Sequence, residues 1–97
     1  MPAYVIASVS EACDDEALAE YRRRNTAAVE AAGGRFVVRG GAIEVLEGGW
    51  DPLRVVVMEF DDMDAARAWY ESDAYQAAKP LRVGASTTAI VLVEGAA

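Results

Sequence analysis

A set of arginine, aromatic and amide side chains in this sequence could together bind a small organic anion. Arginine donates paired hydrogen bonds to carboxylates, and aromatic rings offer an apolar surface to the rest of such a molecule. We therefore predict a site for a small aromatic or carboxylate ligand, lined by Tyr21, Arg22, Asn25, Arg39, Trp69, Tyr75 and Arg82.

Catalysis by the same residues is an alternative. In a cofactor-independent oxygenase or isomerase, Glu59 or Tyr21 would accept a proton from the substrate, and an arginine would stabilise the resulting enolate. A purely structural explanation also stays open, because Arg39 or Arg82 could cover apolar surface with its stem and pair with Glu59. In that case the protein would be a structural or stress-related dimer without a ligand.

Several other kinds of chemistry are excluded by the residues that the sequence lacks. It contains no histidine, which removes histidine-dependent nucleophile pairs and the commonest metal ligand. The acidic runs at 14–16 and 61–64 lie where helices are expected to start, so their carboxylates are expected to cap those helices. We expect no metal and no cofactor, and we expect Cys13 to be an inert thiol.

The composition indicates a single soluble domain over residues 1–97. A net charge of −7 disfavours binding to nucleic acid or to anionic lipid, and no apolar run approaches the ~18 residues that span a bilayer. The N-terminus lacks a basic and apolar leader, and Cys13 has no second cysteine with which to form a disulfide. These features favour the cytoplasm.

The first half of the chain predicts one helix and two strands that would position the candidate residues. A helix capped by Asp14 or Asp15 is expected to run to about Ala32 and to end at the glycine pair 33–34. A strand at 35–39 is expected to bend at the glycine pair 40–41 and to continue through 42–47. Trp50, in the following turn, is expected to cover the core or a dimer edge.

The second half predicts a strand at 53–60, a helix at 63–71 and a last strand near 88–93. Ser72 or Asp73 could cap one further helical turn through residues 74–78, and Pro80 is expected to stop it. Residues 81–85 would then lead into the last strand. Together with an N-terminal strand at 4–9, the order is βαββαβ, which predicts an α+β ferredoxin-like plait: a four-stranded antiparallel sheet with two helices on one face.

The predicted strands carry apolar residues on both of their faces. In the strand at 53–60, alternation places Leu53, Val55 and Val57 on one side and Val56, Met58 and Phe60 on the other. Two helices can cover only one face of the sheet. We therefore predict a homodimer in which a second copy of the chain covers the other face.

The sequence also resembles a known family over nearly its whole length. The matching segments are Ala3–Ile6, Tyr21, Gly33–Phe36, Arg39–Gly41, Glu44–Gly48, Arg54–Val57, Glu59–Phe60, Ala65–Tyr70, Ser72, Tyr75 and Arg82. In these segments the chain is similar to the domain of unknown function 1330, part of the dimeric α/β-barrel superfamily.

The resemblance implies that two ferredoxin-like plaits pack sheet against sheet as a dimeric α/β barrel. It implies no particular activity, because the family has none that is settled, while the wider superfamily includes cofactor-free monooxygenases, haem enzymes, lactone isomerases and stress-response proteins. The absence of histidine removes the proximal ligand that the haem-using relatives normally need.

Overall fold

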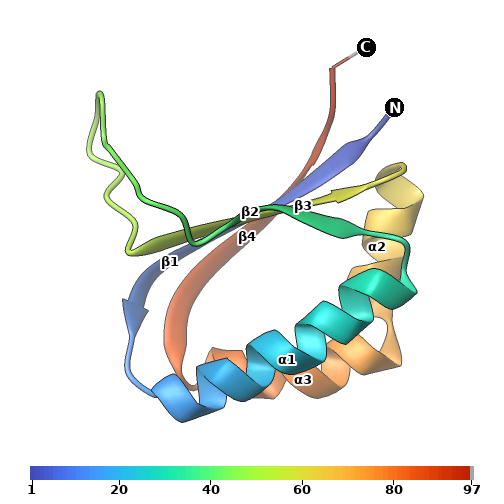
Figure 1. The fold of residues 1–97 in the computed structure, drawn as a ribbon, viewed down its shortest axis with the longest axis horizontal. Coiled ribbons are helices and arrows are strands. Elements are labelled where there is room, and N and C mark those ends of the chain that lie inside the picture. Colours follow the sequence, from blue (N-terminus) through green and yellow to red (C-terminus); the bar gives the residue numbers. More distant parts are fainter. Residues whose placement is uncertain (97) are drawn as a thin grey trace.

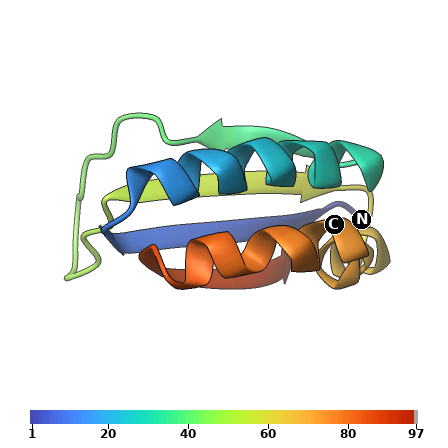
Figure 2. The same ribbon diagram turned by 90° about the horizontal axis from the view of Figure 1, so that it is seen from below.

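Four antiparallel strands form one sheet, and three helices cover one of its faces (Figures 1 and 2). The structure is a computed structural model that describes residues 1–96. The strand order is β2-β3-β1-β4, which confirms the predicted ferredoxin-like plait. The elements are β1 (Ala3–Ala12), α1 (Asp15–Ala31), β2 (Arg35–Arg39), β3 (Arg54–Phe60), α2 (Met63–Glu71), α3 (Asp73–Val83) and β4 (Ser86–Glu94).

Each helix begins at the polar residue that its sequence offers as a cap. The Asp14 Oδ1 atom accepts a hydrogen bond from the Ala17 backbone at 3.0 Å at the start of α1, and Asp62 caps α2 in the same way. Ser72 serves two helices, because its hydroxyl donates to the Trp69 carbonyl at the end of α2 and accepts from the Tyr75 backbone at the start of α3. Side-chain caps of this kind satisfy backbone groups that the helix itself leaves unpaired.

The core lies between the helices and one face of the sheet. Its largest fully buried side chains are Trp69, Tyr75, Phe60, Met58, Val5 and Val29. The strand register brings Val5 beside Met58 on β3 and Leu92 on β4, so alternate residues of three strands face the helices together. The predicted division into two faces is therefore confirmed for residues 55–60, whereas Leu53, expected on the face of Val55 and Val57, lies outside β3.

The end of α1 depends on two successive glycines. Gly33 has φ 78°, a left-handed conformation that side chains with a Cβ rarely adopt. At Gly34, an added Cβ would lie only 2.4 Å from the Phe60 ring. The first glycine turns the chain and the second lets its backbone pass close to the core.

The predicted continuation of β2 through residues 42–47 is wrong. Residues 40–53 form a long loop that projects beyond the sheet (Figure 1). Its base is closed by backbone hydrogen bonds from Gly40 to Val55 and from Leu53 to Val9. A strand needs a neighbour for its backbone groups, and β3 begins only at Arg54, so residues 42–47 find no partner strand within the protomer.

The prediction that Pro80 stops the last helical segment is also wrong. Pro80 lies inside α3, which continues through 81–83, so that the sheet is covered by three helices and not by two. A proline inside a helix removes one backbone hydrogen bond. Because α3 lies alongside α1 (Figure 2) and buries Tyr75 and Ala78, tertiary packing outweighs that loss. None of the helices in residues 1–96 is long and apolar enough to span a membrane.

Candidate functional site

A cleft of about 160 Å³ opens between α1, the C-terminal end of α3 and the helix-covered face of the sheet. Its volume is close to the ~150 Å³ of a cavity that encloses a benzene molecule. Tyr21, Arg22, Asn25, Arg39 and Arg82, all predicted from the sequence, line this one cleft. The other lining residues are Ala7, Val9, Ala12, Asp15, Leu18, Phe36, Leu53, Arg54, Val56, Met58, Ser86 and Thr88.

The cleft exists because the sheet carries small side chains under the first turns of α1. Ala7, Val9 and Ala12 of β1 contribute to its walls, whereas the other end of the sheet is filled by Phe60 and Trp69. The Phe60 and Trp69 rings lie 5.7 Å apart, centroid to centroid. Bulky rings therefore close one end of the helix-sheet seam, and small residues leave the other end open.

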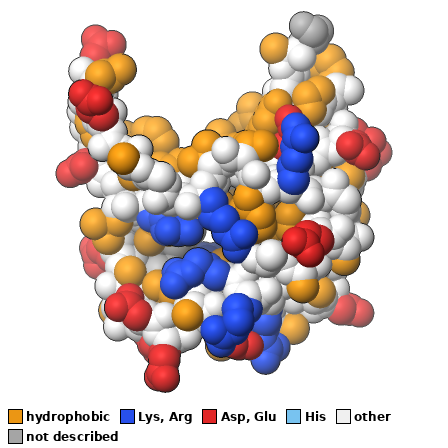
Figure 3. All heavy atoms as spheres, viewed as in Figure 1, with side chains coloured by type: hydrophobic (Ala, Val, Ile, Leu, Met, Phe, Trp, Pro, Cys, Tyr) orange, Lys and Arg blue, Asp and Glu red, His pale blue; other side chains and the backbone are white. Residues whose placement is uncertain are grey.

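Positive charge dominates this cleft although the protein as a whole is acidic. Arg22, Arg39, Arg54 and Arg82 line it, and Asp15 is the only acidic lining residue in the described part of the chain. The four ion pairs found within residues 1–96 use other arginines: Arg23, Arg24, Arg35 and Arg67. In Figure 3, basic side chains gather between α1 and the sheet, while acidic ones are spread around the periphery. The cleft arginines are thus left without a carboxylate partner.

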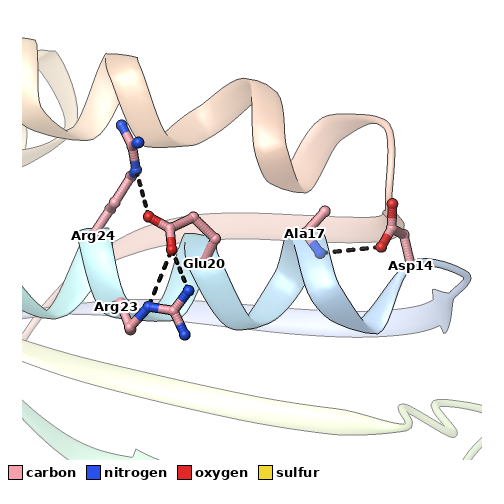
Figure 4. Close-up of polar contacts among 5 residues, drawn as sticks. All are labelled: Asp14, Ala17, Glu20, Arg23 and Arg24. Atoms are coloured by element: carbon pink, nitrogen blue, oxygen red, sulfur yellow. Dashed lines mark hydrogen bonds and ion pairs between the residues drawn. The ribbon is translucent and has the colours of Figure 1, made fainter.

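The run Arg22–Arg24 divides between two roles. Glu20 lies between Arg23 and Arg24, and each donates through its Nε atom to a different Glu20 oxygen at 3.0 Å (Figure 4). These hydrogen bonds lower the pKa of Glu20, that with Arg24 most. Arg22 takes no part in these hydrogen bonds and lines the cleft. Two residues of the run therefore belong to an exposed, glutamate-paired cluster, whereas the third belongs to the site.

Arg54 and Arg39 form the sheet side of the positive region. Partial burial, followed by repulsion from Arg22 and Arg39, lowers the pKa of Arg54. The Arg39 guanidinium lies 4.0 Å from the centre of the Phe36 ring and donates a hydrogen bond to Thr26. Like charges held this close are stabilised by a bound anion.

Gly40 lies directly against the Arg54 side chain. A Cβ added at Gly40 would lie 2.0 Å from the Arg54 Nη1 atom, and the glycine has φ 72°. By contrast, a Cβ added at Gly41 would meet nothing within 4 Å. The backbone at position 40 thus leaves room for the guanidinium where it lines the cleft.

We predict that Gly40→Ala displaces Arg54 and weakens anion binding in the cleft about tenfold, with a loss of about 1–2 kcal/mol in the free energy of unfolding from the strained φ. Calorimetric titration with an aromatic carboxylate, together with urea unfolding, measures both effects. Gly41→Ala is the matched control and should change neither. Equal affinity in the two variants would show that the position of Arg54 does not matter for binding.

Tyr21 and Arg82 lie together on the α3 side of the cleft. The Tyr21 hydroxyl is 3.1 Å from that of Tyr75, and the Arg82 guanidinium lies 5.8 Å from the centre of the Tyr21 ring. Burial, more than the neighbouring Tyr75, raises the pKa of Tyr21 far above its ordinary value. At neutral pH Tyr21 is therefore protonated and can donate a hydrogen bond, but it is a poor proton acceptor.

Three of the predicted polar and aromatic residues serve the core. The buried Asn25 side chain contributes to the cleft wall. Its amide oxygen already accepts a hydrogen bond from the Trp69 indole at 2.9 Å. Trp69 and Tyr75 are almost completely buried, with ring centroids 4.4 Å apart, and neither lines the cleft. Their predicted role as ligand contacts is corrected accordingly.

Glu59 does not join the cleft arginines. It lies on the opposite face of the sheet, where it accepts a hydrogen bond from the Tyr4 hydroxyl at 2.8 Å and pairs with Arg35. This hydrogen bond is the main reason that the pKa of Tyr4 is raised. The expected pairing of Glu59 with Arg39 or Arg82 is therefore wrong, because alternation along β3 turns Glu59 away from both.

The same alternation would have identified Arg54, which the sequence reasoning missed. Arg54 shares its strand face with Val56 and Met58, so its side chain had to point toward the helices. Ser86 and Thr88, also missed, lie on the corresponding face of β4 and hydrogen-bond to each other at 2.8 Å. Alternation marks them as well, because they share their strand face with Ile90 and Leu92, which pack against the core.

Trp50 lies over the sheet face that the helices leave open. Its indole nitrogen donates to the Ser8 hydroxyl at 3.0 Å, and the side chain is largely exposed. It does not cover the core of its own protomer. Within residues 1–96, no three acidic or cysteine side chains gather closely enough to hold a metal ion.

The family described as "Domain of unknown function (DUF1330)" matches residues 2–96 of the chain. A comparison with curated proteins gives no match. Among solved structures, a protein of unknown function from Rhodopseudomonas palustris is 21% identical, with a TM-score of 0.75 over 99% of this chain and 83% of that one.

Two further solved structures have the same fold. A dimeric ferredoxin-like protein of unknown function from Jannaschia sp. CCS1 is 16% identical, with a TM-score of 0.66 over 98% of this chain and 100% of that one. A protein from Caulobacter crescentus, named as a candidate antibiotic biosynthesis monooxygenase, is 17% identical, with a TM-score of 0.63 over 99% and 91% of the two chains. At sequence identities this low, the similarity to these three structures shows a shared fold only.

Proposed function

Starting from the fact that the chain belongs to the DUF1330 family, we propose that it is a homodimeric protein that binds a small organic anion, aromatic or aliphatic, in the arginine-lined cleft. The ligand would place its anionic group on the arginines and its apolar body against the sheet. Carboxylates are the ligands that this combination of guanidinium groups and apolar wall suits best.

The observation that carries this proposal is the arrangement of charge. In a protein with net charge −7, four arginines line one cleft with a single acidic neighbour, while carboxylates elsewhere pair with other arginines. Partly buried, unpaired cations lower the stability of the empty protein and favour an anion that pairs with them. A structural dimer without a ligand would have no need of such a cleft.

Calorimetric titration with benzoate tests the proposal. We expect saturable binding that Arg54→Gln weakens about tenfold, because one charge-assisted hydrogen bond is removed without removing the bulk of the side chain. Thermal unfolding should show a smaller rise in Tm with benzoate for the variant than for the unsubstituted protein.

Arg67→Gln is the matched control for this titration, since Arg67 pairs with Asp64 on α2 and does not line the cleft. Its affinity for benzoate should be unchanged. Absence of saturable binding, or equal loss of affinity in the two variants, contradicts a cleft-bound anion.

The homodimer is supported by the sheet face opposite the helices. Val91 is 51% exposed and Val93 46% exposed on that face, next to the apolar side chains of Ile6 and Val57. Figure 3 shows hydrophobic side chains in the hollow between two projections, which Figure 1 identifies as the 40–53 loop and the chain termini. A continuous apolar surface of this kind is typical of an interface.

The occupant proposed for this face is a second copy of the chain, and the Jannaschia protein of the same fold is likewise described as dimeric. The loop adds its own exposed apolar side chains, Leu46 and Trp50 among them, along one border of the face. These would extend the contact with the partner subunit. Two plaits facing each other in this way form the dimeric α/β barrel.

The alternative function is that of a cofactor-independent oxygenase or isomerase, in keeping with the name of the Caulobacter protein. Such an enzyme needs a proton acceptor beside the arginines. Within the protomer, Glu59 lies on the other face of the sheet and the Tyr21 hydroxyl is held protonated. These two features favour binding over catalysis, and oxygen consumption on addition of a bound ligand would reverse that preference.

A further inference from the structure

We infer that the preferred ligand is a small dianion that carries a negatively charged group at each end of a ring-sized apolar body. The inference rests on the proposed function and specifies its ligand class. It follows from the way the four cleft arginines divide into two groups on opposite sides of the cleft floor.

The first group consists of Arg22, Arg39 and Arg54. These three also line a shallow depression at the outer side of the cleft, next to Thr26 and to Arg23, whose charge is paired with Glu20; Arg82 does not contribute to it. Arg22 and Arg39 are close enough to repel Arg54 and lower its pKa. Three guanidinium groups around one opening can neutralise one strong oxyanion between them.

The second group is Arg82 with its polar neighbours. The Arg82 Nε atom is buried and has no hydrogen-bond partner within residues 1–96. The Tyr21 ring lies beneath the guanidinium, and Ser86 bonds to the Arg82 carbonyl through its hydroxyl. Because Arg82 lines the cleft and forms no ion pair within residues 1–96, a second anionic group placed here would pair with its guanidinium.

Sheet topology separates the two groups. Arg54 lies on β3, whereas Ser86 and Thr88, which line the cleft on the side of Arg82, lie on β4, and β1 runs between these strands. β3 and β4 are therefore two strand spacings apart, about 10 Å. The floor between them carries Ala7 and Val9, which offer no hydrogen bond to a polar ligand centre.

The size and the walls of the cleft indicate how large and how apolar the central part of the ligand is. A cleft of about 160 Å³ accommodates one ring or a short chain. Leu18, Val56 and Met58 present apolar surface to it. A benzenedicarboxylate combines such a body with two anionic ends. Its ortho, meta and para isomers hold these two ends at three different distances.

The test is calorimetric titration of the intact protein with benzoate and with the ortho, meta and para benzenedicarboxylates at equal ionic strength. We expect at least one dicarboxylate to bind about tenfold more tightly than benzoate. Arg82→Gln should abolish that preference, so that no dicarboxylate binds the variant more tightly than benzoate does, whereas Arg54→Gln should weaken the binding of both kinds of ligand. Arg67→Gln should change neither, and thermal unfolding checks that each variant is folded.

Two outcomes overturn the inference while leaving the proposed function standing. One is equal affinity for benzoate and every dicarboxylate in the unsubstituted protein. The other is a dicarboxylate preference that survives Arg82→Gln, which would mean that the second charge is recognised elsewhere. Failure of benzoate and of all three dicarboxylates to bind would overturn the proposed function itself, and the inference with it.

Discussion

Replacement of Val57 by aspartate is expected to dissociate the proposed dimer and to leave the protomer folded. Val57 lies in the middle of the open sheet face, opposite Ile6 on β1 and Val38 on β2. In a symmetric dimer the substitution places two carboxylates in the interface, each without a partner. Burying an unpaired charge costs several kcal/mol, so the dissociation constant should rise by at least about 100-fold.

Sedimentation velocity at micromolar concentration measures this effect, because the protomer mass is 10.3 kDa and the dimer has twice that mass. Leu92→Asp is the informative comparison. Leu92 faces the helices and packs against the core, so a charge there should unfold the protomer and not merely separate two copies. A Val57→Asp protein that sediments as a stable dimer would contradict the assignment of this face.

Replacement of Trp69 by alanine is expected to lower the free energy of unfolding by about 3–5 kcal/mol, a large share of the total stability of a small domain. The Trp69 ring packs against Phe60 and Tyr75, and its indole donates the hydrogen bond that the buried Asn25 carbonyl accepts. The substitution therefore leaves a cavity and an unsatisfied polar group together. Chemical denaturation, monitored by circular dichroism, measures the loss.

Two further variants separate the contributions. Trp69→Phe retains most of the ring but leaves the side-chain oxygen of Asn25 without its donor. This variant should lower the free energy of unfolding by about 1–3 kcal/mol. Glu71→Ala, at the exposed C-terminal end of α2, should cost less than about 1 kcal/mol. A Trp69→Ala protein as stable as Glu71→Ala would show that the centre of the core has been misidentified.

The sequence was sufficient to predict those features that depend on interactions between residues close together in the chain. The helix caps at Asp14, Asp62 and Ser72 depend on residues within a few positions of each cap, and each lies within the short polar segment predicted to hold it. The two faces of β3 follow from alternation alone. The order of elements, combined with the handedness of crossover connections, then determined the ferredoxin-like arrangement.

The sequence erred where a local signal competes with tertiary contacts. The alternating apolar residues after Gly40 resemble a strand, but a strand forms only beside another, and β3 begins too late to pair with them. Pro80 is a helix-breaking signal, yet α3 continues through it, since burial against the rest of the protein compensates for one lost hydrogen bond.

The same distinction between local and tertiary interactions applies to the candidate site. Residue types predicted seven residues that could line one site, and five of them, Tyr21, Arg22, Asn25, Arg39 and Arg82, line the cleft. Only the tertiary structure decided which arginines meet in one cleft, that Glu59 faces away from them, and that Trp69 and Tyr75 fill the core. Three of the four ion pairs within residues 1–96 join side chains three or four positions apart on one helix and follow from local spacing. The convergence of the cleft arginines depends instead on distances between residues far apart in the chain, which the packing of helices on the sheet creates and which no local pattern encodes.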